Sequence, residues 1–373
     1  MRAIRAHPRL RLQLVVTGMH LLPRFGRTIR QIRADGWRID ATVPMQTGQD
    51  DPAADAEALG RGIAGLARVL RRLRSDVVLV LGDRIEAFAG AAAAACARIV
   101  VAHVHGGDRA AGDVDDSLRH AITKLAHVHF AATADAALRL RRLGEEPRRI
   151  FVVGAPGLDE IRSIRRPSTR RLGEILGWSQ PREFALIVQH PCGRPPRIER
   201  RDMAATLAAV ADTGLAGVIV YPNSDPGHSG IIAAIHEATG IGPPSPRDRG
   251  SMAAGFSDWI VMPSIDRTTY IRLLKAARVL VGNSSSGIIE SKTAGVPVVN
   301  IGPRQRGRTR CGPNVIDCPY GRSAVRRAIR RALARPVRSG GGVYGDGRTG
   351  RRIAAILGRL SMDAAFRRKL ITY

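Results

Sequence analysis

Short apolar runs that alternate with helical segments constrain the fold of this chain more than any other feature. Leu12–Thr17, Asp76–Leu81 and Ile99–His103 are rich in Val, Leu and Ile, as buried strands of parallel sheets are. Stretches with helical spacing, such as Asp55–Leu73 and Ile85–Ala97, lie between them. Because the connections are short, this alternation predicts an α/β fold with a doubly wound parallel sheet.

The alternation begins again in the second half of the 373 residues, so we expect two domains. The strands predicted there are Phe184–Gln189, Gly217–Tyr221, Asp258–Met262, Arg278–Val281 and Val296–Ile301. A Gly- and Pro-rich loop is expected at Gly240–Phe256, and the Arg-, Pro- and Ser-rich segment Arg162–Arg170 marks the junction of the halves. We therefore predict an N-terminal domain at residues 1–165, a C-terminal domain at residues 166–350 and a basic helical tail at residues 351–373.

The formal net charge of +27 comes almost entirely from arginine, since lysine occurs only at positions 124, 275, 292 and 369. Such an excess is compatible with nucleic-acid binding or with a GC-rich coding sequence. The arginines are dispersed and aromatic residues make up only 4% of the chain. We therefore favour a phosphorylated small molecule over nucleic acid as the ligand.

The four cysteines form no CxxC pair and no zinc-like spacing, which favours a reducing compartment over a disulfide framework. The alanine-rich run Gly90–Ala97 is too short to span a bilayer, and the N-terminus lacks the pattern of a signal peptide. These features predict a cytoplasmic protein without a membrane segment.

The segment Ile99–Lys124 gathers groups able to transfer protons at the end of one predicted strand. His103 and His105 precede a Gly-Gly break, and strand alternation would place both imidazoles on one face. His105 suits proton transfer, because the imidazole pKa lies near neutral pH. His103, His105 and Asp108 could be drawn as metal ligands, but no metalloenzyme spacing is present and we predict no metal.

Acidic residues and an arginine follow at the start of the next predicted helix. Asp115 and Asp116 could act in catalysis or could simply cap that helix. Arg119 is a candidate phosphate clamp, because its planar fork suits phosphate. Asp83 and Arg84 follow the preceding predicted strand. Asp83, too, could act in catalysis or could simply cap the helix that follows.

A second cluster of small and polar residues joins a strand to a helix in the C-terminal half. The segment comprises Asn283, Ser284, Ser285, Ser286 and Gly287. Small residues and a helix N-terminus would suit a diphosphate, although a Ser/Gly helix cap is the simpler alternative. Glu290 could accept hydrogen bonds from ribose hydroxyls.

Other polar groups follow the neighbouring strands of this half. His190, Asn223 and Asp225 lie just beyond two strand ends, and Arg304 and Arg308 follow the last predicted strand. The arginines could bind anionic phosphate or could be part of a solvated basic run.

Nine ordered blocks between Leu12 and about Tyr320 resemble one known family, the UDP-N-acetylglucosamine 2-epimerases. The resemblance is to their hydrolysing branch, which serves sialic acid and legionaminic acid type pathways. The blocks are VTGMHL (16–21), FGRT (25–28), GDRIEA (82–87), AHVHGGD (102–108), DDSLRHAITK (115–124), VGAPGLD (153–159), YPNSD (221–225), GNSSSGIIE (282–290) and VNIGPRQRGR (299–308).

The resemblance implies a glycosyltransferase-B-like fold of two Rossmann-like domains, with UDP held mainly by the C-terminal one and the final helix returning to the N-terminal one. It implies no cofactor, a UDP-sugar substrate and a homo-oligomer, either a dimer or a tetramer. The catalytic residues implied are Asp83, His105, Asp115 and His190. The substrate-binding residues predicted are Arg84, His103, Arg119, Asn223, Asp225, Asn283, Ser284, Ser285, Ser286, Gly287, Glu290, Arg304 and Arg308.

The implied reaction eliminates UDP from a UDP-N-acetylhexosamine and then hydrates the resulting glycal. The products would be UDP and free N-acetylmannosamine or a diacetamido analogue. A non-hydrolysing epimerase that returns a UDP-sugar is one alternative, although that branch has Glu where His105 stands. A non-catalytic binder of nucleotide sugar or nucleic acid is another.

Two departures from the family pattern stand out. The family's first strand and its Gly-Thr-Arg turn are missing, and we expect that the start codon is misassigned, because a missing central strand would expose a sheet to water. Asp108 stands where this branch usually has Glu, so its carboxylate reaches one methylene less far.

Overall fold

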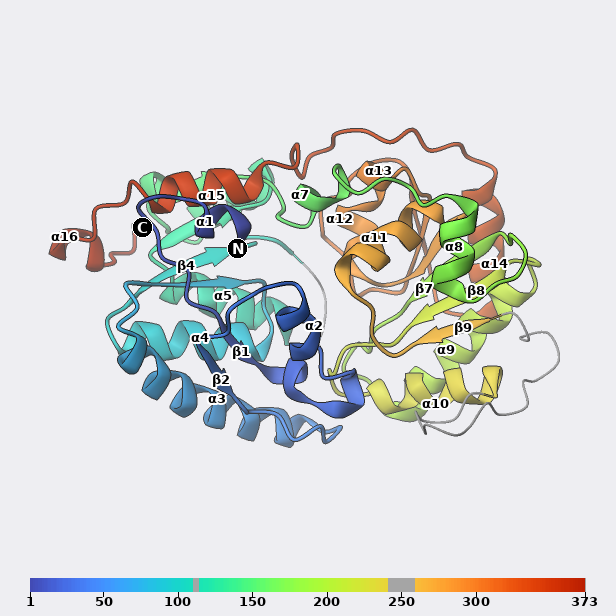
Figure 1. Cartoon of the computed structure of the whole chain (residues 1–373), viewed down its shortest axis with the longest axis horizontal. Coiled ribbons are helices and arrows are strands. Elements are labelled where there is room, and N and C mark those ends of the chain that lie inside the picture. Colours follow the sequence, from blue (N-terminus) through green and yellow to red (C-terminus); the bar gives the residue numbers. More distant parts are fainter. Residues whose placement is uncertain (110–113, 241–258, 373) are drawn as a thin grey trace. The chain divides into compact units, whose positions relative to one another are not determined.

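The computed structural model describes residues 1–109, 114–240 and 259–372. The chain forms two compact units (Figure 1). Unit 1 comprises Met1–Asp159, Gly307–Thr309 and Val343–Tyr373, and unit 2 comprises Glu160–Arg306 and Arg310–Gly342. The chain leaves unit 1 after Asp159 and returns to it for its last segment at Val343, whereas the predicted boundaries lie after residues 165 and 350. Most of the loop predicted at Gly240–Phe256, and Asp258 of a predicted strand, lie outside the described residues.

Unit 1 contains a four-stranded parallel sheet in the order β3-β4-β5-β6. Its strands are β3 (Val77–Leu81), β4 (Val100–Val104), β5 (Val128–Ala131) and β6 (Ile150–Val152). The intervening helices are α4 (Ile85–Cys96), α5 (Asp115–Leu125) and α6 (Ala134–Arg142). All five residues of β4 are buried, as expected of a central strand in a parallel sheet.

The sheet of unit 1 is interrupted on the other side of β3. Strands β1 (Val15–Thr17) and β2 (Ala41–Val43) form a separate two-stranded parallel sheet, and among the described residues no strand pairs with the outer edge of β3. Leu79 and Leu81 of β3 are 39% and 59% exposed. The apolar side chains of this edge strand are therefore partly open to solvent.

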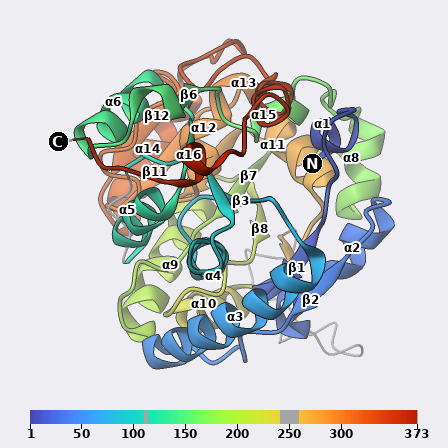
Figure 2. The same ribbon diagram turned by 90° about the vertical axis from the view of Figure 1, so that its left-hand side faces the viewer.

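Helix α3 (Pro52–Leu73) joins β2 to β3 and begins with an N-cap residue followed by a proline. The Asp51 side chain accepts hydrogen bonds from the backbone N–H groups of Ala53 and Ala54, and Pro52 occupies the first turn. Helix α3 packs against α4 (Figure 2). The alanines of α4 form a core with Leu66 and Leu70, so small side chains permit close packing.

Unit 2 contains a six-stranded parallel sheet in the order β12-β11-β10-β7-β8-β9. The strands are β7 (Phe184–Val188), β8 (Ala216–Val220), β9 (Ile260–Met262), β10 (Val279–Gly282), β11 (Val298–Ile301) and β12 (Val315–Cys318). The helices are α8 (Thr169–Leu176), α9 (Pro196–Ala211), α10 (His228–Thr239), α11 (Arg267–Ala276), α12 (Ser285–Ile289), α13 (Ser291–Ala294) and α14 (Arg322–Leu333). The strand order reverses between β7 and β10, and ligands of such sheets bind at the carboxyl ends beside this point.

The chain ends on unit 1 through α15 (Thr349–Leu357) and α16 (Ala364–Arg367), and the short helix α1 (Arg2–Arg5) packs on α15 (Figure 2). Asp159, in α7 (Leu158–Ile161), accepts hydrogen bonds from the backbone N–H groups of Thr349 and Gly350. Lys369 donates hydrogen bonds to the backbone carbonyls of Thr123 and Lys124 at the end of α5. The terminal segment is therefore tied to unit 1.

Candidate functional site

Neighbouring strands bring Asp83 and His105 to the same edge of the sheet in unit 1. Strands β3 and β4 pair in register, with Leu81 opposite Val104, and the two residues follow these strand ends. Gly82 adopts φ 78°, and its N–H donates to the Val104 carbonyl. The glycine thus allows the sharp turn that places Asp83 beside the end of β4.

His105 adopts a left-handed backbone conformation, with φ 68°. This region is uncommon for residues other than glycine, and such backbone geometry concentrates at functional sites. The turn brings the His105 Nδ1 atom to 2.9 Å from Oδ2 of Asp108, which is only 2% exposed. Burial alone would raise the pKa of Asp108, but the charge and hydrogen bond of His105 outweigh it, so that this pKa is lowered.

Arg119 lies inside this group rather than on its surface. The side chain is 1% exposed and forms ion pairs with Asp83 and, at 2.8 Å, with Asp116. It also donates a hydrogen bond to the Asp108 carbonyl. The fork of Arg119, predicted to clamp a phosphate, is directed to carboxylates of its own unit in this structure.

His103, which was predicted to contact substrate, lies in the interior of unit 1. Its ring is completely buried, with Nε2 2.8 Å from the Gly82 carbonyl and Nδ1 3.4 Å from the Thr123 hydroxyl. Burial lowers the pKa of His103 to about 3, so the ring is neutral at physiological pH. His103 thus supports the turn before Asp83.

The remaining predicted residues of unit 1 lie around this group. Asp115 is half-buried in the first turn of α5. Arg84 is 3.2 Å from Glu86, and the charge of Arg308 contributes to lowering the pKa of Asp108. Asp83, His105, Asp108 and Asp115 form what we call the acid/base group of unit 1.

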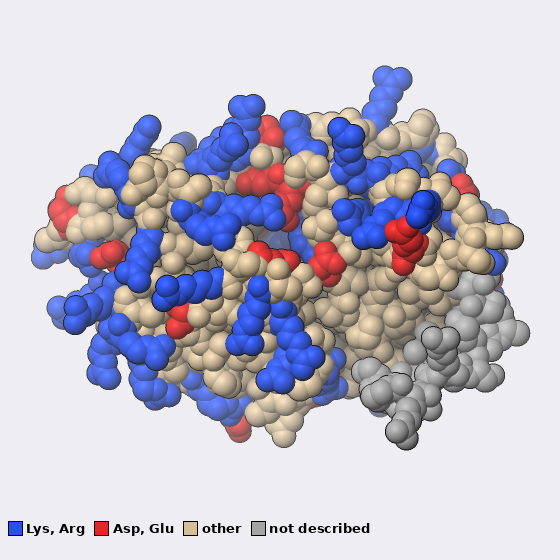
Figure 3. Space-filling model, viewed as in Figure 1, with Lys and Arg blue, Asp and Glu red and all other residues tan. Residues whose placement is uncertain are grey.

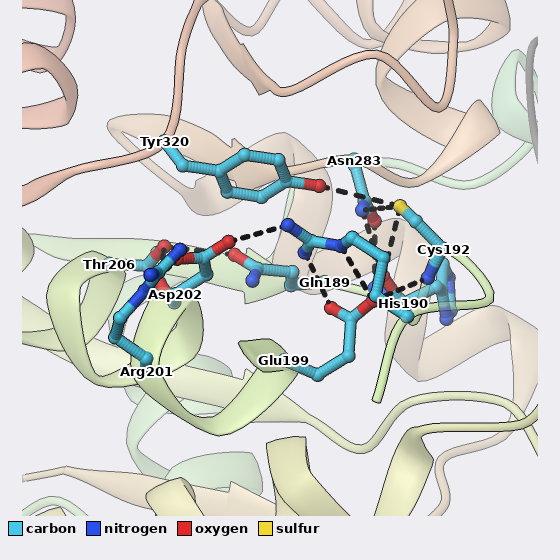
Figure 4. A network of polar contacts seen from close by, with 10 residues as sticks. Gln189, His190, Cys192, Glu199, Arg201, Asp202, Thr206, Asn283 and Tyr320 are labelled. Carbon is cyan, nitrogen blue, oxygen red and sulfur yellow. Dashed lines mark hydrogen bonds and ion pairs between the residues drawn. The ribbon is translucent and has the colours of Figure 1, made fainter. Parts of the chain in front are cut away.

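In unit 2, His190, Asn223 and Asn283 follow the carboxyl ends of β7, β8 and β10. The backbone N–H of Asn223 donates to His190 Nδ1 at 3.1 Å, and the Asn223 side chain donates to Asp225. Arg304 lies 3.5 Å from Asp225, so four predicted residues come together here. The loop after β7 is held by further polar contacts, which Figure 4 shows around His190 and Cys192.

The Asn-Ser-Ser-Ser-Gly segment forms the start of α12, where Ser284 is the N-cap and Ser285 is a half-buried first residue. The Ser286 hydroxyl donates to Glu290. Gly287 is buried, and a Cβ atom on it would lie 2.9 Å from Val298 of β11. Gly287, predicted to bind substrate, therefore permits close packing of α12 on the sheet.

Arg267 is a residue that the sequence analysis missed. Its guanidinium forms a two-point ion pair with both carboxylate oxygens of Glu290, at 2.8 and 3.1 Å. Arg267 opens α11, directly after the capping residue Asp266. The same Asp-Arg pattern at a helix start drew attention to Asp83 and Arg84, and could have identified Arg267.

Neither a metal site nor a membrane-spanning helix is present within the described ranges 1–109, 114–240 and 259–372. No three His, Cys, Asp or Glu side chains in them converge as a metal site would require. No helix within them is long and apolar enough to cross a membrane. Lys and Arg side chains are spread over much of the face drawn in Figure 3.

Comparison with known proteins identifies the relatives of this chain. The family model described as UDP-N-acetylglucosamine 2-epimerase matches residues 2–358. A Legionella pneumophila protein named UDP-N,N′-diacetylbacillosamine 2-epimerase (hydrolyzing) is 35% identical over 362 residues, covering 97% of this chain and 92% of that protein. The UDP-N-acetylglucosamine 2-epimerase of Neisseria meningitidis is 32% identical over 331 residues, covering 89% of this chain and 82% of the relative.

Solved structures agree in fold. The Neisseria meningitidis UDP-GlcNAc 2-epimerase bound to UDP-GlcNAc superposes with a TM-score of 0.74 at 16% identity, covering 95% of this chain and 93% of that one. The Methanocaldococcus jannaschii UDP-GlcNAc 2-epimerase, in complex with UDP-GlcNAc and UDP, gives 0.66 at 18% identity, covering 93% and 99%. The predicted glycosyltransferase-B-like fold with two Rossmann-like units is thus confirmed. Over nearly its whole length, this chain belongs to the UDP-N-acetylglucosamine 2-epimerase family.

Proposed function

We propose that the chain is a hydrolysing 2-epimerase, which converts a UDP-2-acetamido sugar and water into UDP and the free 2-epimeric sugar. The observation that carries this proposal is the 35% identity over 97% of the chain to a relative named as a hydrolysing enzyme. That relative and one from Campylobacter jejuni are named for N,N′-diacetylbacillosamine. UDP-N,N′-diacetylbacillosamine is therefore our first candidate substrate, and UDP-N-acetylglucosamine, which would give N-acetylmannosamine, is the second.

We assign the proton transfers to the acid/base group of unit 1. His105 is held by Asp108 in the way that a carboxylate orients a catalytic imidazole. Asp83 is partly exposed and ion-paired to Arg119, which keeps its carboxylate in place. A base in this group would take the C2 proton while the C1–O bond to UDP breaks, giving a 2-acetamido glycal with a C1–C2 double bond.

The second step returns water to the double bond. The hydroxyl of water adds to C1, and a proton is delivered to C2 from the opposite face by an acid of the same group. One proton leaves C2, one returns to it, and one water is consumed, so the step balances without a redox cofactor. Two partners on opposite faces of the sugar are required, and Asp83, His105 and Asp115 supply more than one titratable group.

We assign the nucleotide to unit 2. His190 follows β7 at the switch point of the sheet, Asn223 follows the neighbouring strand β8, and Arg304 adds positive charge beside Asp225. Arg267 holds the Glu290 carboxylate in place, and a carboxylate can accept hydrogen bonds from ribose hydroxyls. Cationic and N–H donors that stabilise a departing diphosphate would lower the barrier of the elimination.

Release of UDP tests the proposal directly. Purified protein is incubated with each candidate UDP-sugar, and the products are separated by anion-exchange chromatography. We expect UDP and a neutral sugar to appear in equal amounts. A UDP-sugar as the only product would favour the non-hydrolysing alternative, and no turnover of either substrate would contradict both.

The cytoplasmic location and the homo-oligomer also remain proposals. The four cysteines are free, as in proteins of reducing compartments, and nucleotide sugars are substrates of such compartments. Light scattering coupled to size-exclusion chromatography distinguishes a dimer or tetramer from a single chain.

A further inference from the structure

Asn283 holds the backbone of His190 at two points (Figure 4). Its side-chain oxygen accepts a hydrogen bond from the His190 N–H at 2.7 Å, and its side-chain NH₂ group donates to the His190 carbonyl at 2.8 Å. Asn283 follows β10 and His190 follows β7, and these two strands are paired. The amide of Asn283 therefore extends the ladder between the two strands by one step.

A glycine makes this approach possible. Gly282 adopts φ 138°, and a Cβ atom on it would lie 2.0 Å from the Val188 carbonyl oxygen. Any larger residue would push β10 away from β7 and move Asn283 out of reach of His190. Gly282 and Asn283 thus act together, because the glycine lets the two strands approach closely and the Asn283 amide joins them by hydrogen bonds.

The amide of Asn283 is committed to this role. The residue is 1% exposed, and its own carbonyl accepts a hydrogen bond from buried Gln305. Both polar ends of the side chain contact the backbone of His190. Asn283 was predicted to bind substrate, and its side-chain contacts suggest a second route of action, through His190.

The imidazole of His190 is fixed as well as its backbone. The N–H of Asn223 points at His190 Nδ1, so this ring nitrogen must be the acceptor. A neutral imidazole that accepts at Nδ1 carries its proton on Nε2. The ring is therefore presented as an Nε2–H donor, which suits an anionic oxygen of a diphosphate.

The far end of the same loop is anchored to α9. Buried Glu199 accepts a hydrogen bond from the Cys192 N–H and forms a two-point ion pair with Arg194. Arg194 also pairs with Asp202, and its guanidinium stacks over the Tyr320 ring, 4.3 Å from the ring centroid. With Asn283 at one end and Glu199 at the other, the loop has little freedom.

We propose that Asn283 is a positioning residue: by fixing the backbone of His190 it keeps the ring nitrogen Nδ1 at the Asn223 N–H, so that Nε2–H is the hydrogen-bond donor to the leaving diphosphate. The loss of kcat expected on replacing Asn283 rests on the proposed function, whereas the tautomer expected for His190 does not. Asn283→Ala should lower kcat by roughly 10²-fold with KM changed little, because a misplaced group costs about this much. The ¹⁵N spectrum of histidine-labelled wild-type protein should show His190 protonated at Nε2, and Asn283→Ala should show averaging of the two tautomers.

Thr206→Val provides the matched control. Thr206 is equally buried and donates to Gln189, the residue before His190, without touching His190 itself. This variant should lose thermal stability but retain both kcat and the single tautomer, and Asn283→Ser serves if Asn283→Ala does not fold. A wild-type His190 protonated at Nδ1, or an Asn283 variant with wild-type kcat and tautomer, would overturn the proposal. An Nε2–H signal in a protein that releases no UDP would instead count against the proposed function alone.

Discussion

His105 and Asp108 form a pair in which the histidine takes an uncommon left-handed backbone conformation and its Nδ1 atom meets a buried carboxylate at 2.9 Å. The Asp108 carboxylate reaches the imidazole from within the protein. This relationship assigns different roles to the two side chains. His105 is the group that would exchange protons with substrate, and Asp108 orients it.

Replacing His105 by Gln should lower kcat on the order of 10²–10⁴-fold while UDP binding persists, because general acid–base catalysis contributes about that much. Steady-state kinetics and UDP titration by calorimetry give the two quantities. His7→Gln, which removes an imidazole near the N-terminus, is the control and should leave kcat unchanged. Wild-type turnover in His105→Gln would remove His105 from the mechanism.

Replacing Asp108 by Asn keeps the shape of the side chain but removes its charge. We expect kcat to fall by roughly 10²-fold, since the imidazole loses its orienting partner. Steady-state kinetics measures this fall. A wild-type kcat in Asp108→Asn would show that Asp108 does not orient His105.

Arg119→Met should destabilise unit 1. The change leaves the carboxylates of Asp83 and Asp116 without their buried counter-charge, at a cost on the order of 3 kcal/mol in the free energy of unfolding. Urea denaturation measures this loss. Arg84→Met is the matched control, because the partly exposed Arg84–Glu86 pair is worth less than about 1 kcal/mol. Equal free energies of unfolding in the two variants would contradict the prediction that the ion pairs of Arg119 stabilise unit 1 more than the Arg84–Glu86 pair does.

His103 should make stability depend on pH below neutrality. Its pKa is about 3 in the folded protein, against 6.5 for an ordinary histidine, because burial disfavours the charged ring. Between these values the unfolded chain binds the proton and the folded chain does not, so stability falls as the pH drops from 6.5 towards 3. The contribution is at most about 1.4 kcal/mol per pH unit. Urea midpoints at pH 7 and pH 5 should differ less in His103→Gln than in wild type, and equal differences would contradict this role.

The strand ends could be read from the sequence, but the directions of side chains could not. Alternation placed His103 and His105 on one face, whereas the positive φ of His105 turns it away from the strand and leaves His103 buried. Arg119 was indistinguishable from a surface arginine, because its burial depends on carboxylates that precede it by as many as 36 positions. Long-range pairing of this kind leaves no local pattern.

Two short strands, β2 and β12, are not predicted from the sequence. β2 and β12 contain Thr42 and Asp317 among only a few apolar residues, so neither forms the continuous run typical of a buried strand. Asn283 was recognised as unusual but assigned to substrate, because its partner His190 lies on another strand. The blocks resembling the family identify candidate residues, and the structure adds the contacts that hold each of them in place.

The most direct test of the central claim is the reaction of UDP-N,N′-diacetylbacillosamine in D₂O, followed by mass spectrometry and proton NMR of the products. Elimination and hydration predict UDP and a free 2-epimeric sugar that carries one deuterium at C2. A UDP-sugar as the deuterated product, or a free sugar that retains the original C2 proton, would contradict the account.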